Sequence, residues 1–299
     1  MIRTSEEVRE ALAAGRPVVA LESTVLAHGL PWPRNLEVGR ALEEEVRAGG
    51  AVPVTLAVIG GVPTAGLSPQ EMERIARSEG VLKLSTRDLP VALAQESDGA
   101  TTVAATMWLA RQAGIRVFAT GGIGGVHRGP LPDVSADVTE LARTPLLVVC
   151  AGAKAILDLP ATCEALETAG VLVVGWQTEE MPAFYARSSG LPVDVRADSA
   201  EEVAALWRAA RELALPGALL LCVPPPERFA LGTIEVEEAI SGALARARAE
   251  GVHGKEITPF LLRAVGEATG GRSLEANVAL LRNNARVAAA VAAALAVSS

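Results

Sequence analysis

The sequence predicts an α/β fold, a three-layer α/β/α arrangement with a largely parallel sheet and a helix-rich C-terminal third. The 299-residue chain is 50% hydrophobic and 21% charged, which is enough apolar material for a large core. Short runs rich in Val, Leu and Ile alternate with helical patterns, as in α/β proteins. These runs lack the polar alternation of half-exposed strands, so we expect parallel strands that are buried on both faces.

Seven runs have the length and composition of buried strands. They are Pro17–Leu21, Val52–Ile59, Val81–Leu84, Arg116–Ala119, Leu146–Cys150, Val171–Gly175 and Ala218–Val223. Because neighbouring parallel strands need a crossover connection, helices are expected between them.

Helix start and stop signals lie between these runs. Ser68, Pro69 and Glu71 have the pattern of a capping box with proline at the first helical position. The expected helices are Leu36–Ala48, Ala100–Ala113, Ala153–Ala169, Ser199–Ala214, Val236–Glu250 and Ser273–Ala296. The chain has no repeat of 20–50 residues and no low-complexity linker. We therefore expect a single domain over residues 1–299, with a split near residue 215 as the alternative.

Composition excludes several classes of protein. A net charge of −8 and 3% aromatic residues do not provide the basic face that nucleic-acid binding needs. Three cysteines without CxxC spacing argue against a disulfide framework and a zinc knuckle, and favour the cytoplasm. The N-terminus has no apolar signal region, and the Ala-rich C-terminal run is too short to cross a bilayer. We expect no membrane span and no nucleic-acid partner, whereas a small anionic substrate is compatible.

Lysine is rare in this chain, which has 24 arginines and only Lys83, Lys154 and Lys255. Arginine can replace lysine as a solvated charge but cannot form a Schiff base, so each retained lysine points to a specific role. Lys154 is expected in the first turn of a helix that follows a buried strand. The helix dipole disfavours an ammonium there, which suits an amine that attacks a carbonyl carbon. The alternative is a lysine that reaches solvent or a phosphate.

Polar residues collect after the predicted strands, at the edge where ligands bind in open α/β sheets. Glu22 follows the first strand and is either a general acid/base with a raised pKa or a helix cap or ion-pair partner. The segment TGGIGGVHRG follows the fourth strand and matches neither a dinucleotide fingerprint nor a P-loop. Its backbone amides, with His127 and Arg128, suit an anion. The alternative is a glycine turn that carries a solvated His–Arg pair.

Two further groups of polar residues are candidates. Asp133 and Asp137 are four apart and would share a helix face, where one carboxylate with waters and substrate oxygens would bind Mg²⁺ or Mn²⁺. Spacing alone favours the alternative that Asp133 or Ser135 caps the following helix. Asn277, Asn283 and Asn284 interrupt the apolar last helix. Asn277 is either a reader of a polar ligand, such as a base edge, or a satisfied core amide.

Seven motifs, from about residue 17 to 290, carry a resemblance to a known family. They are ALESTVLAHGLPWPRN, AVPVTLAVIGG, TTVAATM, FATGGIGGVHRG, VCAGAKAILDL, GKEITPFLL and GGRSLEANVALLRNNA. In this order they resemble the pseudouridine-5′-phosphate glycosidases, also called the indigoidine synthase A-like family. The resemblance implies an α/β/α core, a homotrimer, a divalent metal that is usually Mn²⁺, and no fused kinase domain in a chain of this length.

The resemblance also implies a reaction, the reversible conversion of pseudouridine 5′-phosphate and water into uracil and ribose 5-phosphate, classed with the carbon–oxygen lyases. The usual role is pseudouridine degradation. An amine on C1′ opens the ribose ring, and an iminium lets the C1′–C5 bond break in a retro-aldol-like step. Two other functions stay open at this point, a Schiff-base aldolase for sugar phosphates and a non-catalytic binding module that kept the fold.

The resemblance assigns a role to each matching residue. Lys154, in AGAK, would form the Schiff base, and Glu22, in LEST, would be the acid/base. Asp133 would hold the metal, with Asp137 as the fallback because the RGPLP loop is about two residues shorter than usual. The substrate-binding residues would be Lys83, Val103, Ser135, Ala136, Asp137 and Asn277, the last facing uracil, together with the anion-binding pair His127 and Arg128.

Overall fold

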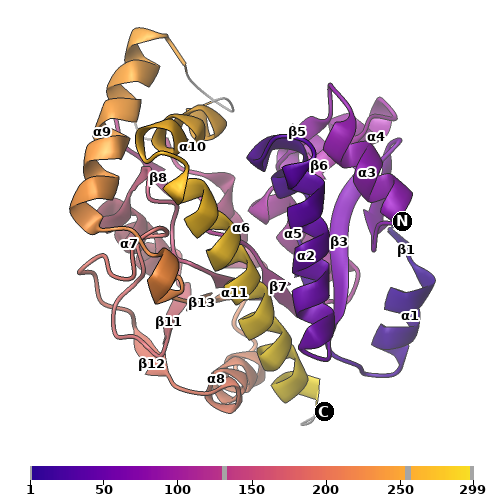
Figure 1. Ribbon diagram of the computed structural model, residues 1–299. Helices are drawn as coiled ribbons and strands as arrows, with labels where there is room; N and C mark the ends of the chain where they lie inside the picture. The colour runs from indigo at the N-terminus through magenta and orange to yellow at the C-terminus, as the bar shows by residue number, and fades with distance from the viewer. Residues whose placement is uncertain (1, 130–132, 253–256, 297–299) are drawn as a thin grey trace.

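The computed structural model describes residues 2–129, 133–252 and 257–296 (Figure 1). Its centre is an 11-stranded sheet. The strands are β1 (Arg3–Thr4), β2 (Val18–Leu21), β3 (Val52–Ile59), β4 (Val62–Ala65), β5 (Leu82–Leu84), β6 (Gly99–Thr101), β7 (Val117–Ala119), β9 (Leu147–Cys150), β11 (Leu172–Trp176), β12 (Val195–Ala197) and β13 (Leu219–Cys222). Their order is β1-β4-β3-β2-β7-β9-β13-β11-β12, with β5 and β6 branching beside β3. Most pairs are parallel, but β3 runs antiparallel to β4 and β6.

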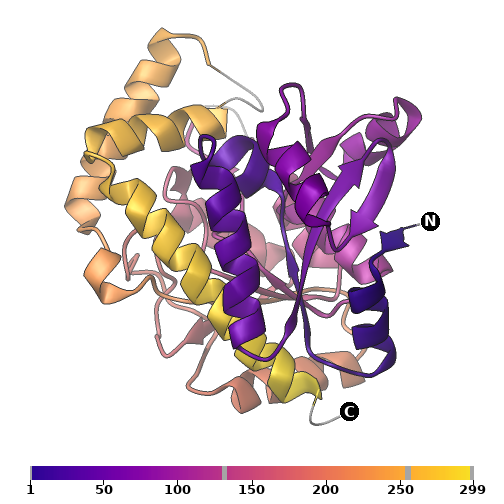
Figure 2. The same ribbon diagram turned by 45° about the vertical axis from the view of Figure 1, so that its right-hand side comes forward.

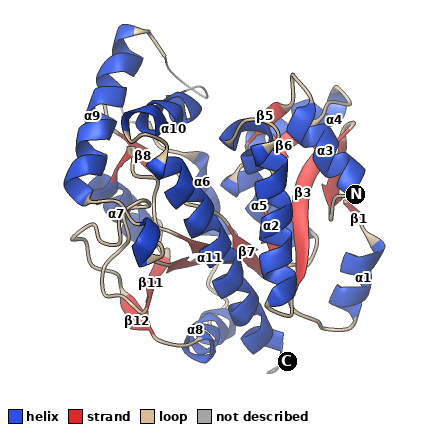
Figure 3. Cartoon of the chain, in the orientation of Figure 1, coloured by secondary structure: helices blue, strands red, loops and turns tan. Residues whose placement is uncertain are grey.

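A second, two-stranded sheet pairs β8 (Val126–His127) with β10 (Leu157–Asp158) in antiparallel register. The helices are α1 (Glu6–Ala13), α2 (Arg34–Ala48), α3 (Pro69–Arg77), α4 (Leu89–Ala94), α5 (Val103–Gln112), α6 (Ala136–Arg143), α7 (Leu159–Thr168), α8 (Ala200–Glu212), α9 (Thr233–Ala249), α10 (Ile257–Ala268) and α11 (Arg272–Ala296). The C-terminal third is mostly helical, as predicted (Figure 3).

Helices cover both faces of the sheet. Helices α2 and α8 lie on one face, where both pack against α11, and α5, α6 and α7 lie on the other, where α6 packs against α5 and α7. The long helix α11 packs between α2 and α8 and lies over β2, β7 and β9 (Figures 1 and 2). The predicted α/β fold with helices on both sides of a largely parallel sheet is therefore confirmed.

The connections of two neighbouring strands run in opposite directions. From β2 the chain passes through α2 to β3, whereas from β7 it passes through α6 to β9, on the other side of the β2–β7 pair. This divergence leaves a crevice beyond the carboxyl ends of β2 and β7. In open α/β sheets, such a switch point is the usual place for a ligand.

All seven predicted strands are present, but α9 begins three residues before the predicted Val236, and two predicted helices start in segments that are not helical. Residues 100 and 101 belong to β6, which pairs with β3 and β5, and the helix begins only at Val103. The helix expected from residue 153 begins at Leu159, because Asp158 is the N-cap and accepts a hydrogen bond from the amide of Ala161. Pro160 in the first turn is the second start signal, and both were present in the sequence.

Helix α11 is long and apolar enough to cross a membrane by length and composition alone. More than half of its apolar stretch is buried inside the protein, against α2, α8 and the sheet. Its side chains Leu280, Ala285, Ala288 and Val291 are fully covered. We conclude that α11 is a core helix, which is what the apolar pattern of the C-terminal residues predicted.

Candidate active site

A cavity of about 360 Å³ opens at the switch point beyond β2 and β7. Nine of the eleven predicted site residues line this cavity. They are Glu22, Lys83, Val103, His127, Asp133, Ser135, Ala136, Asp137 and Lys154. They come from six separate segments of the chain, so the fold brings together what the sequence keeps apart.

Glu22 occupies the centre of this arrangement, directly after β2. Burial raises the pKa of its carboxyl, and the nearby Lys154 ammonium and the Thr120 hydroxyl partly oppose that shift. Thr120 follows β7 and donates a hydrogen bond from its hydroxyl to Glu22 Oε1 across the switch point. A carboxyl whose pKa is raised by burial and that lies close to a lysine is suited to the role of a general acid/base.

Lys154 does not lie on a helix, so the predicted helix-dipole argument is wrong for this residue. It lies in a turn between β9 and β10. Gly152 opens the turn with φ of +79°, Ala153 forms a parallel bridge with Ile123, and the amide of Lys154 donates to the carbonyl of Ile123 at 3.0 Å. The glycine-rich segment thus holds the lysine backbone, and the side chain lines the cavity beside Glu22.

Asp137 is 5% exposed and has a structural role in the cavity wall. Its Oδ1 accepts from the amide of Ala104 at 3.0 Å, and its Oδ2 accepts from the amide of Gly124 at 2.7 Å. Any Cβ added at Gly124 would lie 2.8 Å from Oδ2 and 2.3 Å from the Ser135 hydroxyl. The carboxylate therefore joins the first turn of α5 to the glycine-rich segment.

Asp133 and Asp137 do not share a helix face, contrary to the expectation for a metal site. Helix α6 begins only after Ser135, whose hydroxyl caps it by accepting from the amide of Asp137 at 3.2 Å. Within residues 2–129, 133–252 and 257–296, no group of three or more His, Cys, Asp and Glu residues could hold a metal ion. A hard cation that keeps most of its waters needs only one carboxylate, and the exposed Asp133 fits this better than Asp137.

His127 lies at the end of β8 beside Asp133, and its amide donates to the Asp133 carbonyl at 2.8 Å. Burial lowers the pKa of its imidazole, Lys154 and Lys83 act in the same direction, and Asp133 opposes them. Burial is thus the main cause of the lowered pKa of His127. The N-termini of α5 and α6, at Val103 and Ala136, also line the cavity, and helix N-termini suit an anionic ligand group.

Two predicted site residues lie elsewhere. Arg128 forms an ion pair with Glu237 of α9 and donates to the carbonyl of Leu157 at 2.9 Å, so it ties α9 to the turn that follows Lys154. It faces a neighbouring cavity. Asn277 is half-buried on α11 and is not among the described residues that line the 360 Å³ cavity. The motif residues 254–256, which include Lys255, lie outside the described residues.

Sequence reasoning assigned no role to four polar residues of this region. Ser85 and Thr102 line the cavity, and within the described chain their buried hydroxyls have no hydrogen-bond partner. Both follow a strand, which was the available signal. In the sequence, Thr120 stood out only as the first residue of the glycine-rich segment. Asn284 is fully buried on α11, and its amide donates to the carbonyls of Thr120 and Gly121 at 2.8 and 3.3 Å.

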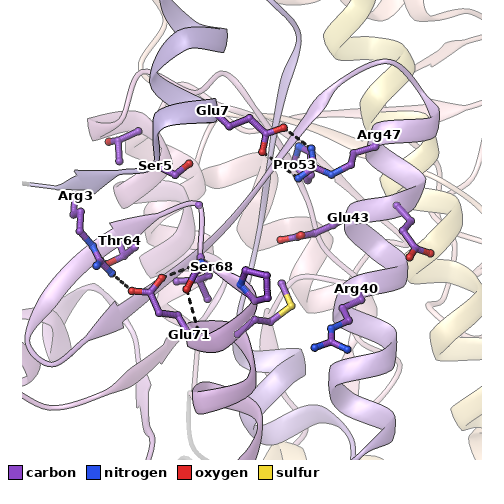
Figure 4. A pocket seen from close by; sticks show the side chains of 16 residues that line it. Arg3, Ser5, Glu7, Arg40, Glu43, Arg47, Pro53, Thr64, Ser68 and Glu71 are labelled. Carbon is purple, nitrogen blue, oxygen red and sulfur yellow. Dashed lines mark hydrogen bonds and ion pairs between the residues drawn. The ribbon is translucent and has the colours of Figure 1, made fainter.

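A larger cavity, of about 630 Å³, lies near β1, α1, α2 and α3 (Figure 4). Its charges are largely matched within its own walls, because Arg3 pairs with Glu71 and Arg47 pairs with Glu7. Glu71 also completes the predicted capping box with Ser68. The walls of this cavity therefore carry structural ion pairs, and the 360 Å³ cavity stays the candidate active site.

The fold and the cavity together define a class of protein, an α/β protein in which a lysine and a buried carboxyl line a cavity at the switch point of its sheet. The family can also be stated. A family model described as indigoidine synthase A like protein matches residues 7–294, and the chain belongs to this family.

Relatives of known name agree with the family assignment. A pseudouridine-5′-phosphate glycosidase of Chloroflexus aurantiacus is 62% identical over 98% of both chains. A protein of the same name from Roseiflexus sp. is 59% identical over 99% of this chain and 96% of its own. Relatives of this name are enzymes, and their similarity indicates that this chain is an enzyme as well.

Two solved structures share the whole fold. The prealnumycin C-glycosynthase AlnA, in complex with ribulose 5-phosphate, has a TM-score of 0.92 and 41% identity, covering 100% of this chain and 98% of its own. An indigoidine synthase A-like protein from Thermotoga maritima has a TM-score of 0.91 and 38% identity, covering 99% of this chain and 97% of its own.

We predict that Glu22→Gln removes a pH dependence of stability. The folded protein holds the Glu22 proton to a higher pH than the unfolded chain, whose carboxyl has a pKa near 4.5. The free energy of unfolding of the wild type should therefore fall, relative to Glu22→Gln, as pH rises from 4.5 through the raised pKa, and stay lower above it. Urea titrations between pH 4.5 and 8 measure this, with Glu201→Gln, an exposed carboxylate on α8, as control. A constant difference would contradict the prediction.

We also predict that Asn284 positions Glu22 through Thr120. Asn284→Leu leaves the Thr120 carbonyl without its buried donor, so the free energy of unfolding should fall by about 1–3 kcal/mol. The turn at Thr120 should also shift, and loss of its hydrogen bond should raise the pKa of Glu22 further. NMR of ¹³C-labelled glutamate measures that pKa. Asn283→Leu is the matched control, since its amide donates to the Pro224 carbonyl instead. An unchanged Glu22 pKa in Asn284→Leu would contradict the role.

Proposed function

We propose that this protein reversibly cleaves the C1′–C5 bond of pseudouridine 5′-phosphate, giving uracil and ribose 5-phosphate. The observation that carries the proposal is the pair Glu22 and Lys154, a desolvated carboxyl with a raised pKa and the lysine whose charge opposes that rise, both lining one cavity. The names of relatives at 52–62% identity support the substrate. Pseudouridine degradation in the cytoplasm is the role we propose.

The chemistry needs both residues because the bond to be broken is carbon–carbon. The neutral amine of Lys154 attacks C1′, the C1′–O4′ bond breaks, and the new ammonium loses a proton to O4′, which leaves a secondary amine. The nitrogen lone pair then forms a C=N bond as the C1′–C5 bond breaks, and the electron pair left on uracil C5 takes a proton from Glu22. Water adds to the iminium, which releases ribose 5-phosphate and regenerates the amine.

The anionic end of the substrate would lie against the opposite wall. Lys83 on β5, the first turns of α5 and α6, and the unpartnered hydroxyls of Ser85 and Thr102 provide cations and donors there. Asn277 keeps its proposed role as the contact for uracil, which requires α11 to approach the bound base.

A divalent metal, Mn²⁺ in our proposal, would add positive charge for substrate oxygens at the mouth of the cavity. Asp133 is the residue that would hold it, because both oxygens of Asp137 already accept from backbone amides. We also propose a homotrimer, on the family resemblance alone.

A second candidate is a C-glycosynthase, which would form rather than cleave a C–C bond to a sugar phosphate. The AlnA structure, which holds ribulose 5-phosphate on the same fold, favours it. The same lysine and carboxyl would serve either direction. The higher identity of the glycosidase relatives is why cleavage of pseudouridine 5′-phosphate comes first.

We predict that Lys154→Arg lowers uracil release from pseudouridine 5′-phosphate by about 10³-fold or more, since arginine keeps the charge but not the nucleophile. Lys83→Arg is the matched control and should act mainly on KM. Borohydride with ribose 5-phosphate should add one sugar phosphate to the wild type, located at Lys154 by peptide mass spectrometry. Near-full activity of Lys154→Arg would eliminate the covalent step, and no uracil from folded wild type with Mn²⁺ would eliminate the proposed reaction.

We predict that chelation abolishes uracil release and that Mn²⁺ restores it. Asp133→Asn should raise the Mn²⁺ concentration for half-maximal activity about tenfold or more without changing the thermal stability of the metal-free protein. Asp137→Asn should instead lower that stability, because its carboxylate pairs buried amides. Full activity of chelator-treated, metal-free protein would remove the metal from the proposal.

A further inference from the structure

Four arginines converge on a cavity of about 350 Å³ at the edge of the sheet opposite the candidate active site. Arg116 directly precedes β7 and Arg111 ends α5, whereas Arg208 and Arg211 come from the last turns of α8. The active-site cavity lies beyond the carboxyl ends of the strands, and this one lies at their amino ends. The two cavities share no lining residue.

These arginines differ from most others in the chain. Elsewhere arginines form close ion pairs, for example Arg74 with Asp98 and Arg143 with Glu140. Within the described ranges, none of the four forms an ion pair, although Glu212 also lines the cavity. In a protein with a net charge of −8, four guanidinium groups around one hollow are an unbalanced local charge.

Two guanidinium nitrogens in this cluster are buried without an acceptor among the described residues, Arg208 Nη1 and Arg211 Nε. Arg211 is otherwise fixed: its Nη2 donates to the carbonyl of Gly217 at 3.2 Å, and its guanidinium lies 4.6 Å from the centre of the Trp207 ring. Burial and the charge of Arg111 lower the pKa of Arg211. Buried charged donors without acceptors are costly, and they show that the protein itself provides few acceptors around this cluster.

Arginines at helix C-termini are common because the helix dipole favours them, and that explains Arg111 or Arg211 singly. It does not explain why four arginines from α5, α8 and the start of β7 face one hollow that Glu212 also lines, without an ion pair among the described residues. We propose that this cavity is a second binding site, for a phosphate-class oxyanion held by the forked donors of Arg111, Arg116, Arg208 and Arg211. The ligand is either free phosphate or the phosphate group of a small metabolite.

Trp207 provides a reporter that separates this site from the active site, because it is 4% exposed and stacks on Arg211. The chain has four tryptophans, so 5-fluorotryptophan labelling gives few ¹⁹F signals, and Trp207→Phe assigns the one of interest. Inorganic phosphate should shift the Trp207 signal saturably, whereas chloride at equal ionic strength should not. Glycerol 3-phosphate tests the second source: tighter binding than phosphate identifies an ester, weaker binding the free ion.

Arg111→Gln/Arg208→Gln removes two of the proposed ligands but keeps the Arg211–Trp207 stack. The apparent Kd for phosphate should rise about tenfold or more in this variant. Arg248→Gln/Arg263→Gln is the matched control, with the same charge change on the exposed sides of α9 and α10. If the double variant fails to fold, Arg111→Gln alone, an exposed residue, serves. The proposal is overturned if phosphate shifts the Trp207 signal no more than chloride does, or if the Kd is unchanged in the Arg111 and Arg208 variant.

Discussion

The buried carboxylate of Asp137 is the interaction on which the candidate site depends most. It accepts from the amides of Ala104 and Gly124, so a single side chain holds the first turn of α5, the glycine-rich segment and the start of α6 together. Burying a carboxylate is unfavourable unless hydrogen bonds satisfy it, and here two amides do so. The same bonds orient the helix N-termini toward the cavity. Asp137 therefore affects a bound substrate by fixing the position of the cavity walls.

The second constraint is the divergence of the chain at β2 and β7. One connection leaves toward β3 and the other toward β9, so the carboxyl ends of these two strands meet at the switch point of the sheet. Glu22 and Thr120 lie on either side of the gap and meet through a hydrogen bond. Asn284 reaches the same point from α11, far along the sequence. Burial at this junction raises the pKa of Glu22, which a solvent-exposed glutamate would not show.

Strand positions were predictable from the sequence because buried parallel strands have a composition of their own. The sequence also identified about half of the residues that line the cavity, some from their place after a strand and the others through the family resemblance. It could not predict the turn at Lys154: that turn is held by a bridge from Ala153 to Ile123, a contact between distant segments. Arg128 looked like a ligand-binding cation because its partner, Glu237, is more than a hundred residues away. Asn284 resembled any other asparagine of an apolar helix until its two carbonyl partners were visible.

The turn that carries Lys154 leaves little room for change. Gly152 has a positive φ, and a Cβ there would lie 2.3 Å from the carbonyl oxygen of Pro182, so backbone is packed against backbone on this side of the cavity. The facing wall is built differently, from the short branch strands β5 and β6 and the single 3₁₀ turn Thr86–Asp88. Change in the shape of this cavity would therefore proceed through the branch, while the lysine turn stays constant. An engineer who seeks to reshape the cavity would randomise residues 85–88 first.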